Sequence, residues 1–298
     1  MENSILGIIF ALISTASWAL CTIILKKLGE RLEPIGITTV KSCLSTLFLF
    51  IAILLTTKEI FVTKEYLFPI ALSGLIGIAI GDSFFFASLN RLSPMVLSLI
   101  LFVGPDLFTG IFGLLFLGEM PTVIAWIGII LTLIGLSLFI FPIKTVNTTN
   151  DKSTTTIIGI ILAILSLCCT AYSMVIIKPV LQMVPTITAT MYRMLFSAVG
   201  LIIIGLYTKK IFNWKYTLSD KKYSLKLTST MLLSTFGGFW LSLSAIKYCD
   251  LIIASTIMTL EPLFILLFMI VFNGYKPKRK EYLGIIFIIV GIIFICKG

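Results

Sequence analysis

The segment Ser93–Pro121, SPMVLSLILFVGPDLFTGIFGLLFLGEMP, decides the fold because it is long and apolar enough to cross a bilayer. About 20 apolar residues suffice for a helical span. Its middle nevertheless carries Gly104, Pro105 and Asp106. A proline inside a helix frees a backbone carbonyl and can kink the helix, and a carboxylate at that depth costs at least about 2.5 kcal/mol on insertion scales. We therefore predict that this helix lines something other than lipid.

The same combination recurs in the second half of the chain. Ser255–Pro277 reads STIMTLEPLFILLFMIVFNGYKP, with Glu261 and Pro262 in mid-span. Pro105 and Pro262 lie 157 positions apart, so each half of the chain contains one such helix. We expect the two prolines to act as hinges, where the helices flex or expose backbone carbonyls.

The composition is that of an integral membrane protein. The chain is 58% hydrophobic with a mean hydropathy of +1.12, whereas soluble domains are usually about 45–50% apolar. The net charge of +10 comes from lysines that separate apolar runs, which is typical of membrane-flanking loops rather than of a nucleic-acid partner. The six cysteines fall in or beside apolar runs and the chain has no histidine, so we expect buried free thiols and no metal site.

We predict an all-α protein of ten transmembrane helices arranged as two inverted five-helix repeats. The predicted spans are roughly 4–26, 34–57, 66–89, 93–117, 121–142, 156–178, 185–207, 227–247, 250–273 and 281–297. The repeats would be residues 1–143 and 156–298, joined by a polar linker loop at 144–155. A second polar connection would run from Thr208 to Lys226.

An internal repeat supports this division. Offsets of 152 to 157 residues superimpose similar positions of the two halves, among them Gly7/Gly159, Ser14/Ser166, Lys41/Arg193, Gly81/Gly238, Ser98/Ser255 and Pro105/Pro262. Because each half has an odd number of spans, the second copy enters the membrane from the opposite side. Inverted repeats are a transporter architecture in which the binding site lies between the repeats near the midplane.

A set of short motifs follows one another over nearly the whole chain: Gly7–Trp18, Lys41, Pro105, Leu117–Pro121, and Trp126 with Gly128. In the order of these motifs the chain resembles the EamA-type branch of the drug/metabolite transporter superfamily. The second half departs from the pattern, with Thr170 where a second tryptophan is expected. The resemblance implies a solute permease whose spans one, three, four, six, eight and nine enclose a central cavity.

Five charged residues lie well inside spans, and Asp106 is the first candidate for the site. Ser98, Phe102, Asp106, Thr109 and Gly113 share one helical face. Such a polar stripe is expected of a substrate-binding cavity wall. The alternative is a structural carboxylate bonded to a neighbouring basic group or backbone amide.

Glu261 occupies the related helix of the second half. Ser255, Thr259 and Pro262 form a stripe there, and Glu261 lies about 100° away from it. We predict that Ser255, Thr259 and Glu261 contribute to substrate binding. The alternative for Glu261 is structural, with its carboxylate accepting hydrogen bonds beside a proline kink.

The remaining charged residues are Asp82, Lys41 and Arg193. Asp82 stands beside a glycine-rich face that favours either close helix packing or a cavity. Lys41 and Arg193 are repeat equivalents. They could anchor their helices by reaching the interface, or they could bind an anion or compensate a charge.

Three aromatic residues, Trp18, Tyr172 and Trp240, complete the predicted substrate site. Aromatic faces can bind apolar or cationic solutes; the alternatives are an interfacial belt or plain packing. Without histidine, and without a P-loop or dinucleotide fingerprint, the sequence predicts no enzyme and no cofactor.

The predicted function is a permease of the cytoplasmic membrane that moves small organic metabolites, such as amino acids or related solutes, by alternating access. The rivals are a lipid-linked flippase and a non-transporting sensor or assembly partner. The expected partners are a small-molecule solute and membrane lipids. If protons drive transport they must bind Asp106, Asp82 or Glu261, because no histidine titrates near neutral pH. The oligomeric state is open, and a monomer is compatible with the sequence.

The basic residues predict the topology. Sixteen lie in the loops opposite the termini, and only Lys58, Lys64, Lys178, Lys247 and Lys297 lie on the side of the termini. The positive-inside rule therefore favours both termini outside. The family resemblance implies the reverse, with both termini in the cytoplasm.

Overall fold

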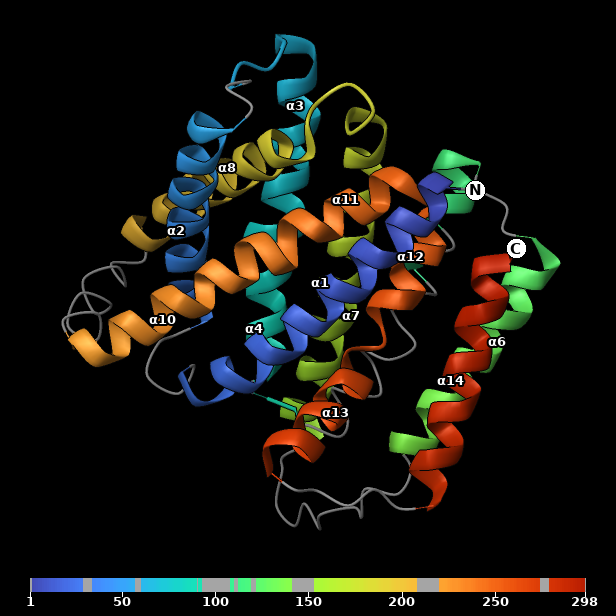
Figure 1. Ribbon diagram of the computed structural model, residues 1–298. Coiled ribbons are helices and arrows are strands. Elements are labelled where there is room, and N and C mark those ends of the chain that lie inside the picture. Colours follow the sequence, from blue (N-terminus) through green and yellow to red (C-terminus); the bar gives the residue numbers. More distant parts are fainter. Residues whose placement is uncertain are drawn as a thin grey trace.

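The computed structural model describes residues 2–28, 34–56, 60–89, 91–92, 108–109, 112–118, 122–140, 153–207, 220–273 and 279–297. All regular structure in these ranges is helical (Figure 1). The first half contains α1 (Glu2–Leu28), α2 (Pro34–Leu55), α3 (Lys64–Ser73), the π-helical η1 (Gly74–Asp82), α4 (Ser83–Leu89), the π-helical η2 (Gly113–Leu117) and α6 (Val123–Ile140). The second half contains α7 (Ser153–Val180), α8 (Thr186–Tyr207), α10 (Lys221–Leu233), the π-helical η3 (Ser234–Trp240), α11 (Leu241–Tyr248), α12 (Leu251–Met258), α13 (Glu261–Asn273) and α14 (Arg279–Lys297).

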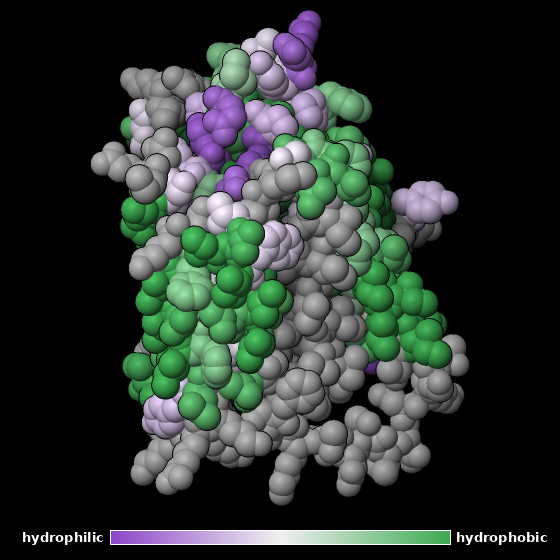
Figure 2. Space-filling view, turned by 90° about the vertical axis from the view of Figure 1, so that its right-hand side faces the viewer, coloured by the Kyte–Doolittle hydropathy of each residue, from purple (hydrophilic) through white to green (hydrophobic). Residues whose placement is uncertain are grey.

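Six helical stretches of the described ranges are long and apolar enough to cross a membrane. They are Ser4–Leu25, Ile35–Leu55, Lys64–Phe85, Ile157–Val180, Thr186–Tyr207 and Lys221–Tyr248. Three shorter apolar helices accompany them. Large apolar side chains cover much of the outer surface (Figure 2), as is required of helices that face lipid. The chain is a multi-pass membrane protein.

Most described helix boundaries lie within a few residues of the predicted spans, and one clear difference comes after residue 207. The predicted span 93–117 lies mostly outside the described residues. The polar connection predicted to reach Lys226 ends earlier, because α10 begins at Lys221. The carboxylate of Asp220 caps this helix by accepting hydrogen bonds from the backbone N–H groups of Lys222 and Tyr223, at 3.0 and 3.3 Å. Tyr223 is buried and its hydroxyl donates to the Leu28 carbonyl at 2.9 Å. That part of the prediction was wrong because capping and burial of Tyr223 outweigh the local polarity.

The structure also differs from the prediction, or does not describe it, at two further places. The predicted span 250–273 is interrupted between α12 and α13, where the Leu260 N–H bonds to the Ile257 carbonyl at 3.1 Å. Pro262 follows in the first turn of α13, where a proline is tolerated because its missing N–H would have no helical partner. Residues 144–152 of the predicted linker 144–155 lie outside the described residues. The last three residues of that predicted linker belong to α7, which begins at Ser153.

The same kind of contact between the two halves occurs at two equivalent places. The Ser14 hydroxyl of α1 donates to the Gly238 carbonyl of η3 at 3.0 Å, and the Ser166 hydroxyl of α7 donates to the Gly81 carbonyl of η1 at 2.8 Å. Ser14 and Ser166 are repeat equivalents, and so are Gly81 and Gly238. Each bond therefore joins the first helix of one repeat to the third helix of the other.

Glycines bring α6 and α14 into close contact at the edge of the bundle (Figure 1). A β-carbon added at Gly135 would lie 2.7 Å from the Gly284 carbonyl oxygen, and one added at Gly291 would lie 2.7 Å from the Gly128 carbonyl oxygen. Elsewhere α2 packs directly on α8. Small residues permit such approaches in a membrane, where packing rather than the hydrophobic effect drives helix association.

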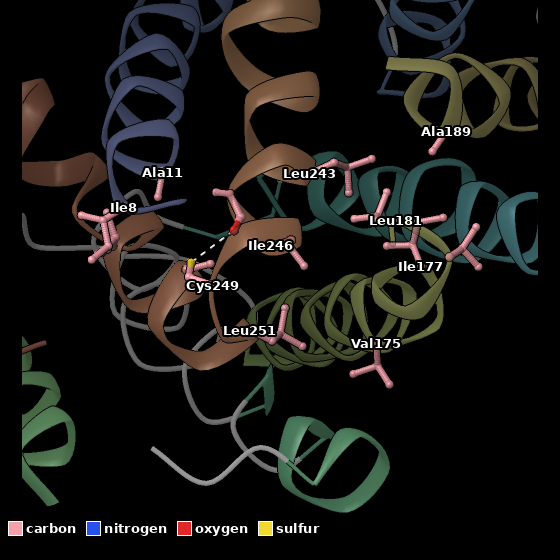
Figure 3. Close-up of a cluster of buried hydrophobic side chains, with 14 of the residues drawn as sticks. Ile8, Ala11, Val175, Ile177, Leu181, Ala189, Leu243, Ile246, Cys249 and Leu251 are labelled. Atoms are coloured by element: carbon pink, nitrogen blue, oxygen red, sulfur yellow. Dashed lines mark hydrogen bonds between the residues drawn. The ribbon is translucent and has the colours of Figure 1, made fainter. Parts of the chain in front are cut away.

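The bundle has two distinct ends. α1 begins and α14 ends at one of them, which we call the terminal side, and α1 ends at the other, which we call the lysine-rich side (Figure 1). The largest cluster of buried apolar side chains joins α1, α7, α11 and α12 close to the terminal side (Figure 3). There the Lys178 ammonium donates to the Cys249 carbonyl at 2.9 Å. The Lys178–Cys249 bond lies within the second repeat, whereas the apolar cluster packs α1 of the first repeat against α7, α11 and α12 of the second at the terminal side.

Candidate functional site

An ion pair links α2 to η1 inside the bundle. The Lys41 ammonium contacts Oδ2 of Asp82, the last residue of η1. The Lys41 side chain is 4% exposed and that of Asp82 is 24% exposed. Lys41 therefore does not reach the interface, and its charge is compensated by a carboxylate that solvent can still approach. Removing either partner of such a pair in a low-dielectric interior is strongly destabilising, because the remaining charge would be buried without compensation.

Two aromatic rings extend this pair into the second repeat. The Lys41 ammonium lies 4.7 Å from the centroid of the Phe239 ring in η3, within cation–π range. Phe239 in turn meets the Trp18 ring edge-on, with centroids 4.8 Å apart. Gly238 allows this approach, since a β-carbon there would lie 3.0 Å from the indole. The offset of 157 places Asp82 on Phe239, so Lys41 lies between equivalent positions of the two repeats.

A second carboxylate is held by α1. The Thr22 hydroxyl donates to Oε1 of Glu261 at 2.5 Å. Thr22 is exposed, yet it lies nine residues, or about 180° of helix, from the outward-facing Ile13. Its exposed surface is therefore directed into the bundle rather than towards lipid. Thr22 lies one helical turn after Trp18 on α1, so the Glu261 contact and the Trp18–Phe239 contact are made by the same face of that helix.

Arg193 forms a separate buried centre on α8. It is 2% exposed, and Nη2 donates to the Ser173 hydroxyl at 2.8 Å. Its Nε has no hydrogen-bond acceptor among the described residues. A β-carbon added at Gly77 of η1 would lie 3.4 Å from Nη2, so glycine makes room for the guanidinium.

The predicted stripe residues of the proline helices contact each other. The Thr109 hydroxyl donates to the Ser255 hydroxyl at 2.7 Å, and both residues are buried. The Thr259 hydroxyl donates to the Thr256 carbonyl. Ser255 lies in the first turns of α12, which starts at the terminal side, so the Thr109–Ser255 bond holds that side together. Ser98, Pro105 and Asp106 lie outside the described residues.

The structure places the other predicted aromatic residues away from the ion pair. The Trp240 indole N–H donates to the Thr186 hydroxyl at 3.1 Å and thereby joins η3 to α8. The Tyr172 ring of α7 is partly exposed and packs edge-on against the rings of Phe112 and Phe116, with centroids 6.2 and 6.1 Å apart. Of the three predicted aromatics, only Trp18 joins the Lys41 and Asp82 cluster.

Comparison with known proteins gives the family. The model of the EamA-like transporter family matches residues 5–141 and again residues 157–297. The chain belongs to the EamA-like transporter family. The family resemblance predicted from the sequence is confirmed, and so is the duplication within the chain. This EamA-like transporter also superimposes on a solved structure titled "Crystal structure of protein" with a TM-score of 0.72. The two chains are 15% identical, and the match covers 98% of this chain and 96% of the other. No curated protein matches it in sequence.

Lys41, Asp82, Phe239, Trp18, Thr22 and Glu261 make up the transporter's candidate site. Two of these residues, Phe239 and Thr22, were not predicted from the sequence. Phe239 is the repeat counterpart of Asp82, and that equivalence was the available signal. Thr22 follows Trp18 by one helical turn and so shares its face. The cluster therefore offers both signs of charge, a hydroxyl and two aromatic rings. Within the described ranges, no group of acidic and cysteine side chains is suited to hold a metal ion.

Proposed function

We propose that this EamA-like transporter is a ten-span permease of the cytoplasmic membrane built from two inverted five-helix repeats, residues 1–143 and 156–298. The duplicated serine–glycine contacts support the inversion. Ser14 and Ser166 each cross from one repeat to the third helix of the other, as a twofold axis between the repeats requires. Because each repeat has an odd number of spans, the second repeat enters the membrane from the opposite side and is inverted relative to the first.

The transported solutes are small organic metabolites, such as amino acids or related molecules. The supporting observation is the Lys41–Asp82 pair, which lies between the repeats with a partly exposed carboxylate. Asp82 and Glu261 would attract an ammonium group and Lys41 a carboxylate, while Trp18 and Phe239 would contact the apolar part of the solute. Charges of both signs suit a zwitterion better than a singly charged molecule.

The mechanism is alternating access, with the solute site facing the lysine-rich side in this conformation. At the terminal side the repeats are packed together by the apolar cluster and by the Thr109–Ser255 bond. In the lysine-rich half Thr22 and Asp82 are exposed within the bundle. Opening the terminal side would separate Thr109 from Ser255, and their hydroxyls, with those of Ser98 and Thr259, would then face the solute.

A counterflow measurement tests this function. Purified protein is first screened for thermal stabilisation by a panel of amino acids and related metabolites, and the stabilising solutes are assayed for counterflow in proteoliposomes. We expect at least one solute to exchange, and Asp82→Asn to reduce that exchange at least tenfold. Lys64→Gln, which removes an exposed charge at the terminal side, should leave it unchanged. Absence of counterflow for every stabilising solute would favour the non-transporting sensor, whereas accelerated movement of labelled lipid would favour the flippase.

The orientation is also a proposal. The sixteen basic residues opposite the termini favour placing the lysine-rich side in the cytoplasm. Cysteines introduced at Lys215 and Lys221 should then resist impermeant thiol reagents added to intact cells. Ready labelling there would place the lysine-rich side outside, as the family resemblance implies.

A further inference from the structure

We propose that Asp82 exchanges its cationic partner during transport, pairing with Lys41 when the lysine-rich side is open and with Arg193 when the terminal side is open. This inference rests on the proposed alternating-access cycle. A difference between the two repeats motivates it. Lys41 and Arg193 occupy equivalent positions in the two repeats, but only the first repeat has an acidic residue at the position of Asp82. The position equivalent to Asp82 in the second repeat is Phe239, so two buried cations share one acidic residue of this kind.

Arg193 lacks an acidic partner in the present conformation. Its guanidinium bonds to the neutral Ser173 hydroxyl, and its Nε has no acceptor among the residues that the structure describes. Within the described parts of the chain, no carboxylate lies at ion-pairing distance from it. Burying an ion without a counter-charge is costly. A conformation that brings a carboxylate to Arg193 would recover that cost, which provides a driving force for the exchange.

Asp82 lies on the helix segment that packs against Arg193. Gly74 of η1 contacts the Arg193 backbone, and Gly77 faces its guanidinium. In a π-helix each N–H bonds to the carbonyl five residues earlier, so Asp82 stands one π-turn after Gly77. The carboxylate is therefore about one helical turn from the second cation.

The two cations lie on either side of a hydrogen bond between α2 and α8, within the interface of these two helices. Ser42 is bonded to Ser197 at 3.1 Å; Lys41 precedes Ser42 by one residue, and Arg193 precedes Ser197 by one helical turn. η1 touches both helices. Gly74 and Gly77 of η1 allow a close approach to α8, while Leu75 fills the space at Gly200 of α8 and Ile78 belongs to the same apolar cluster as Met191 and Met194. A slide of η1 along α8 therefore requires Leu75 and Ile78 to repack while α2 and α8 stay together. A shift of about one turn then carries Asp82 from Lys41 to Arg193.

The experiment measures how often the terminal side opens. Ser255→Cys is introduced into a protein without its native cysteines and placed in nanodiscs, where both sides meet a water-soluble thiol reagent. Ser255 is buried in the present conformation, so its labelling rate reports the population open at the terminal side. Arg193→Gln should lower this rate and Lys41→Gln should raise it, each at least about fivefold, the low end of typical allosteric coupling. Lys64→Gln is the matched control and should not change the rate.

Opposite shifts are the result that a merely structural role for Arg193 would not produce. Shifts in the same direction, or changes below about twofold in folded variants, would overturn the exchange. If Arg193→Gln fails to fold, Lys41→Gln decides alone, and a lowered labelling rate in that variant rejects the proposal. The counterflow assay tests the permease function separately. Opposite shifts of the labelling rate without counterflow would support the exchange of partners and reject the permease function. Counterflow without opposite shifts would support the permease function and reject the exchange.

Discussion

Removal of both partners of the Lys41–Asp82 pair should destabilise the protein by less than the sum of the two single removals. Lys41 is 4% exposed, so Asp82→Asn leaves its ammonium buried without a counter-charge. Breaking a buried pair in this way typically costs about 3–5 kcal/mol. The Phe239 ring, 4.7 Å from the ammonium, offsets up to about 2 kcal/mol of that loss. We therefore expect Asp82→Asn to lower the free energy of unfolding by about 2–3 kcal/mol.

The reverse single change should cost less. Lys41→Met leaves a carboxylate that is 24% exposed and can be partly solvated, so we expect a loss of about 1–2 kcal/mol. In the double variant neither charge remains and the methionine fills the space of the lysine stem. Its loss should fall short of the sum of the single losses by about 2 kcal/mol, which is the coupling expected of residues in direct contact.

The assay is reversible unfolding in mixed micelles by titration with a denaturing detergent, followed by far-UV circular dichroism. Glu65→Gln, at an exposed residue of α3, is the control and should stay within about 0.5 kcal/mol of the unmodified protein. Losses that add within about 0.5 kcal/mol would refute the reasoning, because they would mean that the two charges do not depend on each other.

Three further predictions use other parts of the molecule. Asp220→Ala should destabilise α10 by about 1 kcal/mol, measured by unfolding, whereas Asp250→Ala should cost little because Asp250 precedes α12 without a capping bond; equal losses would contradict the capping role. The Thr109→Cys thiol should react slowly, and solute that drives opening of the terminal side should accelerate its labelling; an inert thiol under every condition would remove Thr109 from the solute path. If protons drive transport, Asp106→Asn or Glu261→Gln should abolish flux driven by a pH gradient while folded protein remains in the membrane, and unchanged gradient dependence in the neutral variants, Asp82→Asn included, would leave facilitated diffusion.

The sequence was sufficient for the membrane class, the duplication and most helix positions, because these depend on apolar run length and on spacing within one chain. The pairing of Lys41 with Asp82 was not predictable in the same way. Both residues were singled out as intramembrane charges, but which faces of two apolar helices meet depends on packing that neither helix encodes alone. Tyr172 illustrates the same limit, since an aromatic ring with one hydroxyl is compatible with a cavity or with the outer surface. Phe239 carries no charge, so only its relation to Asp82 could have drawn attention to it.

The duplicated contact between the first and third helices has a consequence for the resting state. At one copy the Trp18 indole lies against Gly238, and at the other the smaller Thr170 lies against Gly81. In an inverted repeat, the inward-facing and outward-facing forms are related by exchanging the roles of the two copies, so a chain with identical copies would populate both forms equally. The residues that differ between the copies therefore set which side of the membrane the empty binding site faces. Thr170→Trp would make this contact more alike in the two copies and should move that equilibrium towards equality.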